Sequence, residues 1–288
     1  MEVEKKKLLW FYILLSGCLL SIAVSVGCFI AASAMKNDAY RKFTGLSLAS
    51  DVEERTKSYE RAIALCPDRP EAYRLLLETF GEDGRFTKEE SGRFLAIYNA
   101  NHQELEDDAA YGDIHAQAGS LYINAYEDNT TVRLRMALPF FEKAKQHMAN
   151  DAQGKLVVDC YTSIGRYYRD YIWTTTGKEV SSEQMESLVA EISTTLQSFE
   201  TNAASDMTYD RLGFSVAVCN LLYDQRDIFA VTVTENKVFT ILDELYEALP
   251  SPEKLQVQGS KDMILELQSN KAMYYDMLTR AYERAGGI

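Results

Sequence analysis

An uncharged segment of 28 residues, from Leu8 to Met35, constrains this chain more than any other feature of its sequence. A helix needs about 20 apolar residues to cross the hydrocarbon core of a bilayer, so this segment is long enough. The apolar part of a secretory signal is shorter, at about 7–15 residues. The sequence therefore predicts a basic tail over residues 1–7, a transmembrane helix over residues 8–35 and a second domain over residues 36–288.

Two short motifs leave processing of this segment open. Residues 32–34 read Ala-Ser-Ala, which resembles a signal-peptidase site, and residues 15–18 read Leu-Ser-Gly-Cys, which resembles a bacterial lipobox. Apolar residues continue beyond Cys18, whereas a mature lipoprotein normally continues into a polar tether. We therefore favour an uncleaved single-pass anchor, with a cleaved signal and a lipoprotein as the alternatives.

The orientation of this anchor is not decided by counting charges, because three basic residues lie on each side of it. The compact lysine cluster at residues 5–7 favours an N-terminus inside the cell, which places the large domain outside the cytoplasm. The scattered cysteines favour the opposite, since they are typical of buried free thiols in a reducing compartment. Small residues recur every four positions along the segment, a spacing that allows two membrane helices to pair closely.

The charge of the chain is unevenly divided. Residues 1–42 hold six basic and three acidic residues, whereas the rest holds 24 basic and 40 acidic residues, a formal net charge of −16. A domain this acidic is repelled by phosphate backbones, so we do not expect nucleic acid among its partners.

Small and aromatic residues recur beyond the anchor at the spacing of paired helices. The clearest set comprises Tyr59, Ala62, Pro67, Tyr73, Leu76, Phe80, Gly84 and Phe86, and 34 residues separate Ala62 from Ala96. This pattern resembles the tetratricopeptide repeat (TPR), a helix pair of 34 residues. Three positions depart from the family pattern, namely Leu77, Glu89 and Asn101.

Further units of this kind are stretched and less regular. Residues 118–122 and 137–144 resemble the two helices of one unit, and residues 161–168 resemble a first helix whose partner is predicted over 182–199. A weaker match follows at residues 209–216. The resemblance implies an all-α fold, in which TPR-like hairpins stack into an α-α superhelix because no single hairpin can bury its apolar face.

Local signals predict where several helices begin. Capping-box patterns occur at Ser50/Glu53, Thr87/Glu90, Ser181/Gln184 and Thr232/Glu235. We expect Pro70, Pro139 and Pro252 in first helical turns, because an interior proline removes a backbone hydrogen bond.

The family resemblance also implies a concave groove, lined by the first helices, that commonly holds peptides. Arg166 and Arg169 are one helical turn apart and so share a face, and arginine pairs with carboxylates in bidentate geometry. We therefore expect a protein or peptide ligand, either acidic or C-terminal. The Lys/Asn carboxylate clamp of some family members is not reproduced. The predicted groove residues are Arg74, Glu78, Asn124, Thr162, Arg166 and Arg169.

We find no pattern that predicts catalysis, a cofactor or a metal. The three histidines, His102, His115 and His147, lack metal-ligand spacing, and the five cysteines form no C-x-x-C pair. The sequence therefore favours a membrane-anchored scaffold or adaptor within a membrane or envelope complex. The alternatives are a regulatory or sensory subunit of a signalling or secretion system, and a hydrolase with an unrecognised site in its C-terminal half.

Overall fold

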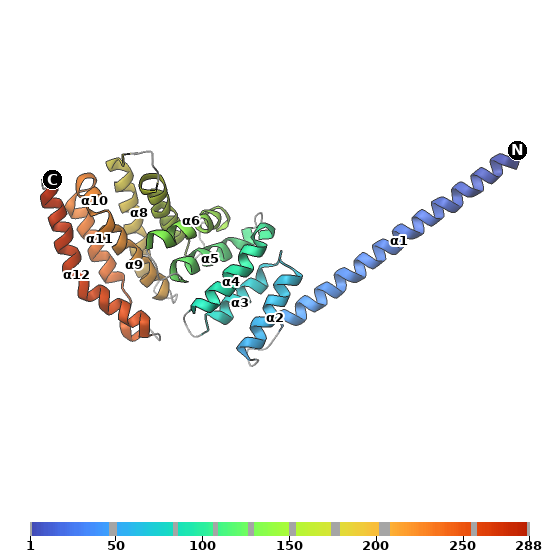
Figure 1. Cartoon of the computed structure of the whole chain (residues 1–288), viewed down its shortest axis with the longest axis horizontal. Helices are drawn as coiled ribbons and strands as arrows, with labels where there is room; N and C mark the ends of the chain where they lie inside the picture. The colour runs from blue at the N-terminus through green and yellow to red at the C-terminus, as the bar shows by residue number, and fades with distance from the viewer. Residues whose placement is uncertain are drawn as a thin grey trace. The chain divides into compact units, whose positions relative to one another are not determined.

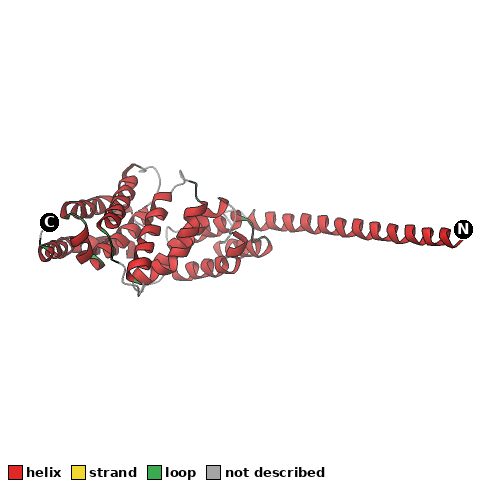
Figure 2. Ribbon diagram, turned by 90° about the horizontal axis from the view of Figure 1, so that it is seen from above, coloured by secondary structure: helices red, strands yellow, loops and turns green. Residues whose placement is uncertain are grey.

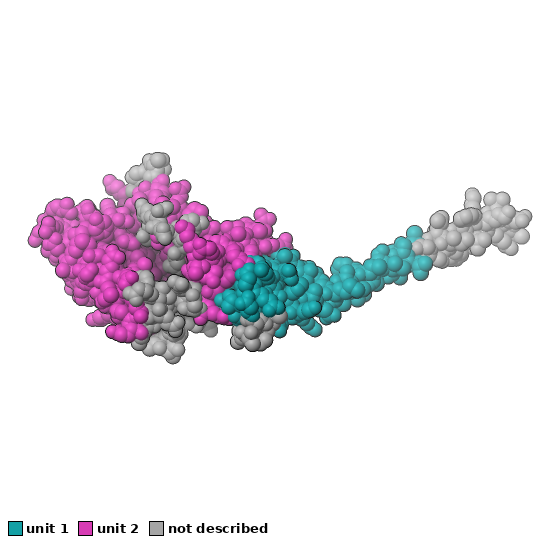
Figure 3. Space-filling view, turned by 60° about the horizontal axis from the view of Figure 1, so that its bottom comes forward, with its two compact units in different colours: residues 1–79 teal, residues 80–288 magenta. Residues whose placement is uncertain are grey.

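The computed structural model is helical in every element that it describes (Figure 2), so the all-α prediction is confirmed for those residues. The chain divides into two compact units, residues 1–79 and 80–288 (Figure 3), with a boundary inside the range predicted as one repeat domain. The described residues are 2–45, 51–82, 86–105, 109–125, 130–149, 154–173, 179–201, 208–254 and 258–286.

The first unit consists of α1 (Glu2–Thr44), α2 (Val52–Leu65) and most of α3 (Pro70–Phe80). Figure 1 shows α1 as one long helix, which continues beyond the predicted end of the membrane span at residue 35. Its last turns pack on α2 and bury Tyr40, while the Arg69 guanidinium lies 4.6 Å from the centre of the Tyr40 ring. The helix α1 therefore runs without a break into the packed part of this unit.

The N-terminal helix has the length and composition of a membrane span. Within the described residues, Leu20–Thr44 meets this criterion, and none of its most apolar window is buried by the rest of the protein. Two of its hydroxyls bond within the helix, since Ser25 donates to the carbonyl of Ser21 at 2.8 Å and Ser21 donates to the carbonyl of Cys18 at 3.2 Å. These two bonds lower the cost of placing the Ser21 and Ser25 hydroxyls in lipid.

The second unit begins with helices that pack in the order of the chain: α4 on α5, α5 on α6, α6 on α7 and α7 on α8. Beyond α8 this order ends, because α8 packs on α10 and α11, whereas α12 packs on α9 and α10. The elements are α4 (Lys88–Asn101), η1 (His102–Leu105), η2 (Ala109–Tyr111), α5 (Gly112–Ala125), α6 (Thr130–His147), α7 (Lys155–Tyr167), η3 (Tyr168–Ile172), α8 (Ser182–Thr201), α9 (Thr208–Asp224), α10 (Arg226–Thr232), α11 (Glu235–Ala248), η4 (Pro252–Lys254) and α12 (Gln258–Ala285).

Two glycines of the predicted repeat pattern permit close helix contacts. A Cβ atom at Gly119 of α5 would lie 2.7 Å from a ring carbon of Phe141 on α6. A Cβ atom at Gly165 of α7 would lie 2.8 Å from Leu138 Cδ1, also on α6. Both glycines therefore lie where α6 meets a neighbouring helix, which is the role that the pattern predicts for small residues.

Two of the predicted capping boxes are confirmed. Thr87 and Glu90 exchange bonds at the start of α4, and Ser181 and Gln184 do so before α8, which also agrees with the predicted range 182–199. At α2 the cap is Asp51, whose carboxylate accepts from the backbone N–H of Glu53 at 3.1 Å. Ser50, the residue predicted for that cap, lies outside the described residues.

Two local predictions are wrong. Thr232 is the last residue of α10, and its hydroxyl donates back to the carbonyl of Ile228 at 2.6 Å, so α11 begins after Thr234 instead. Pro139 lies in the interior of α6 and not in its first turn. Its neighbours Leu138 and Phe141 are buried, and burying such side chains offsets the roughly 3 kcal/mol that an interior proline costs.

Candidate functional site

The six predicted groove residues are divided between the two units. Arg74 and Glu78 lie on α3, in the first unit, and the other four lie in the second. Asn124 is in the last turn of α5, and its side chain lies outside the described set. Thr162 on α7 is fully buried, and its hydroxyl donates to the carbonyl of Val158 at 2.7 Å, which makes it a core residue and not an accessible one.

Arg166 and Arg169 do share a face, because one carboxylate joins them. Oε1 of Glu142 on α6 lies 2.9 Å from Nε of Arg166 and 3.1 Å from a terminal nitrogen of Arg169. Both arginine side chains are nearly half exposed, and Nε of Arg169 also contacts Asp170 at 2.9 Å. Hydrogen bonds to Asp170 and Glu142 raise the pKa of Arg169. Sequence reasoning missed Glu142, since residues 24 and 27 positions apart carry no pairing signal.

A surface pocket of about 430 Å³ lies beside this arginine pair. A π-helical turn, η3, ends α7, and the backbone N–H of Trp173 closes it by donating to the carbonyl of Tyr168 at 2.9 Å. Such turns are frequent at functional sites. The Arg135 guanidinium lies 5.7 Å from the centre of the Trp173 ring. We call this the arginine–tryptophan pocket, and its lining residues are Arg135, Leu138, Pro139, Glu142, Arg169 and Trp173.

The arginine–tryptophan pocket and its edge are locally basic. Arg135, Arg166 and Arg169 contribute three positive charges, against two negative charges from Glu142 and Asp170. An incoming carboxylate would compete with Glu142 for the arginines, while the rings of Pro139 and Trp173 offer apolar contact. The chemistry of this pocket suits an acidic segment that also carries an apolar side chain.

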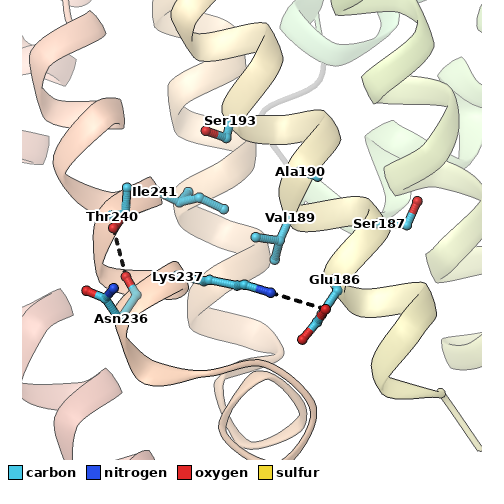
Figure 4. A pocket seen from close by; sticks show the side chains of 9 residues that line it. All are labelled: Glu186, Ser187, Val189, Ala190, Ser193, Asn236, Lys237, Thr240 and Ile241. Carbon is cyan, nitrogen blue, oxygen red and sulfur yellow. Dashed lines mark hydrogen bonds and ion pairs between the residues drawn. The ribbon is translucent and has the colours of Figure 1, made fainter.

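Two further pockets flank α8. One, of about 480 Å³, lies between α8 and α11, where Lys237 reaches across to Glu186 at 3.1 Å (Figure 4). The other, of about 500 Å³, lies between α7 and α8. Ser187 and Ala190 line both pockets.

The fold brings together the three histidines that looked unrelated in sequence. His115 on α5 is fully buried, with Nδ1 2.5 Å from the hydroxyl of Tyr98 on α4. The rings of His115 and His147 are 5.7 Å apart, and His102 stacks on Tyr98. Burial, with Lys143 and His147 nearby, lowers the pKa of His115 to about 4. No cluster suited to a metal ion occurs among the described residues.

Three cysteines of the helical units are buried free thiols, as the sequence predicts. Burial raises the pKa of Cys219 to about 12 and raises the pKa of Cys160 as well. Thiols held in the protonated form are poor nucleophiles, which favours a packing role for Cys160 and Cys219.

No family model matches this chain, and comparison with curated proteins and with solved structures gave no match either. The tetratricopeptide resemblance and the superhelical arrangement that it implies therefore stay predictions.

Proposed function

We propose that this chain is a membrane-anchored, TPR-like scaffold that binds an acidic segment of another protein, within a membrane or envelope complex. The arginine–tryptophan pocket carries the proposal, because it combines exposed guanidinium groups with an aromatic wall. Arginine and tryptophan are the side chains most enriched where protein segments bind tightly.

The anchor is the second part of the proposal. We propose that α1 stays uncleaved and that the helical units lie outside the cytoplasm, as the lysine cluster at residues 5–7 favours. The full 32.6 kDa chain should then remain in the membrane fraction after carbonate washing. Protease added to intact spheroplasts should digest the helical units. A shortened mature chain would contradict the anchor, and protection until lysis would reverse the orientation.

The arginine pair and Glu142 give binding effects of opposite sign. In a titration of the full chain with a fluorescent peptide of glutamate and leucine, Arg166→Gln with Arg169→Gln should weaken binding about tenfold, or about 1.4 kcal/mol. Glu142→Gln should strengthen binding, because it removes the carboxylate that already occupies both arginines. Neutral replacements avoid crowding new carboxylates around Glu142.

The matched control exchanges Lys143 and Lys145 of α6 for glutamine, which removes the same charge without touching the pocket lining. The proposal fails if this control weakens binding as much as the arginine exchange does. It also fails if the acidic peptide does not bind the unaltered chain.

A further inference from the structure

We infer that the exposed face of α8, with the two pockets beside it, docks a basic segment of a partner protein. This α8 surface shares no lining residue with the arginine–tryptophan pocket and carries charge of the opposite sign. The inference therefore goes beyond the proposed function and gives the scaffold a second surface.

The two pockets form one continuous surface because only short side chains of α8 lie between them. Ser187 and Ala190 are exposed, belong to both linings and have short side chains, and Thr194 continues the same row one turn later. The walls come from α7 on one side and α11 on the other. A segment lying across Ser187 and Ala190 would reach both pockets.

The fold does not itself require short side chains on this face. α8 packs through other positions, among them Leu188, Ile192 and Leu196, which are buried. Longer residues such as leucine, lysine or glutamate would extend into solvent at position 187 and would favour the helix more than serine does. Core packing therefore does not explain the short side chains on the exposed face of α8.

The charged side chains that line the two pockets are three carboxylates, Asp159, Glu186 and Glu191, and one lysine, Lys237. Asp159 and Glu191 line the pocket between α7 and α8, and Asp159 is already paired with Lys155 at 2.5 Å and with Lys145 at 3.5 Å. No ion pair to Glu191 occurs within the described residues. At the other pocket, Glu186 holds Lys237, and Glu244 accepts from Ser193 at 2.6 Å just beyond it. Glu191 and Glu244 therefore remain without a cationic partner among the residues described.

A basic segment complements these groups. The side chains of lysine and arginine join an apolar stem to a cationic end, and the rim offers the exposed Leu156 for the stem. Hydroxyls of Ser163, Ser187 and Thr194 can accept hydrogen bonds from the cationic end. The strongly acidic chain would also attract such a segment from a distance.

The test uses the full chain in phosphatidylcholine nanodiscs, titrated with a fluorescent peptide rich in lysine and alanine. Ala190→Trp places a large side chain between the two pockets without changing any charge. Glu191→Lys reverses the charge at the main carboxylate that has no cationic partner within the described part of the chain. Each change should weaken binding by at least about tenfold. The matched control is Ala272→Trp, at an exposed alanine of α12, which should leave binding unchanged. The second probe, the peptide of glutamate and leucine used for the arginine–tryptophan pocket, should not respond to Ala190→Trp.

Three results would overturn the inference. The lysine-rich peptide could fail to bind the unaltered chain. Ala190→Trp and Ala272→Trp could behave alike, which would mean general adhesion to an acidic surface. Ala190→Trp could weaken both probes equally, which would mean that it disturbs the fold. Loss of the acidic probe in the Arg166→Gln and Arg169→Gln variant tests the proposed function separately.

Discussion

Replacing Phe141 with alanine should destabilise the second unit by about 3–5 kcal/mol, the usual cost of removing a buried phenylalanine. Phe141 is fully buried on α6, with its ring stacked on that of Tyr161 at 5.0 Å. Gly119 on α5 also lies against the ring, and its lack of a side chain leaves room for the ring. Gly119 has no side chain that could move into the cavity left by Phe141→Ala, so the surrounding structure can do little to fill that cavity. Loss of the ring would loosen α5, α6 and α7 together.

This effect is measured by urea unfolding of the full chain in detergent, followed through Trp173 fluorescence with Trp10 replaced by phenylalanine. The matched control is Val132→Ala on the same helix, whose exposed side chain should change stability by less than about 0.5 kcal/mol. Equal effects of the two variants would contradict the packing of α6 described above.

Acidification from pH 7 to pH 5 should cost the second unit about 2 kcal/mol through His115 alone. The pKa of His115 is lowered to about 4 in the folded chain, against 6.5 for an unperturbed histidine, chiefly because the ring is buried. Below pH 6.5 the unfolded chain therefore takes up a proton that the folded chain rejects. The contribution of His115 to stability is fully present above pH 6.5 and is lost as the pH falls toward 4.

The groups facing His115 fit this direction. Lys143 and His147 on α6 disfavour a further positive charge, and they outweigh Asp113 on α5. His115→Gln should remove most of the loss between pH 7 and pH 5, whereas His102→Gln should keep it. An unaltered chain that is equally stable at both pH values would contradict this account, as would a His115→Gln chain that keeps the full loss.

Local features of this chain are predictable from sequence because neighbouring residues alone determine them. The bonds at Thr87 and Ser181 each need a partner three residues away, and the tight contact at Gly165 follows from a repeat spacing. The uncharged N-terminal segment likewise needs only its composition to identify a helix long enough for a membrane.

Features that depend on distant residues are not predictable in this way. Glu142 binds Arg166 from another helix, and the packing of α8 on α11 joins segments about 50 residues apart, as the contact of Ser193 with Glu244 shows. The prediction that Pro139 lies in a first helical turn is wrong for the same reason, since tertiary burial of α6 overrides the local preference of proline. The pocket beside Trp173 needs the π-helical turn packed against α6, and the sequence indicates α6 but neither the π-helical turn nor its contact with α6.

The most direct test of the scaffold proposal is site-specific photocrosslinking in the native membrane. A photoreactive phenylalanine replaces Ile172, an exposed residue next to Trp173, and in a second chain it replaces the equally exposed Met273 on α12. The account predicts a discrete protein adduct from position 172 that position 273 does not give, and that disappears with Arg166→Gln and Arg169→Gln. Identical adducts from both positions, or an adduct at 172 that survives the arginine exchange, would contradict it.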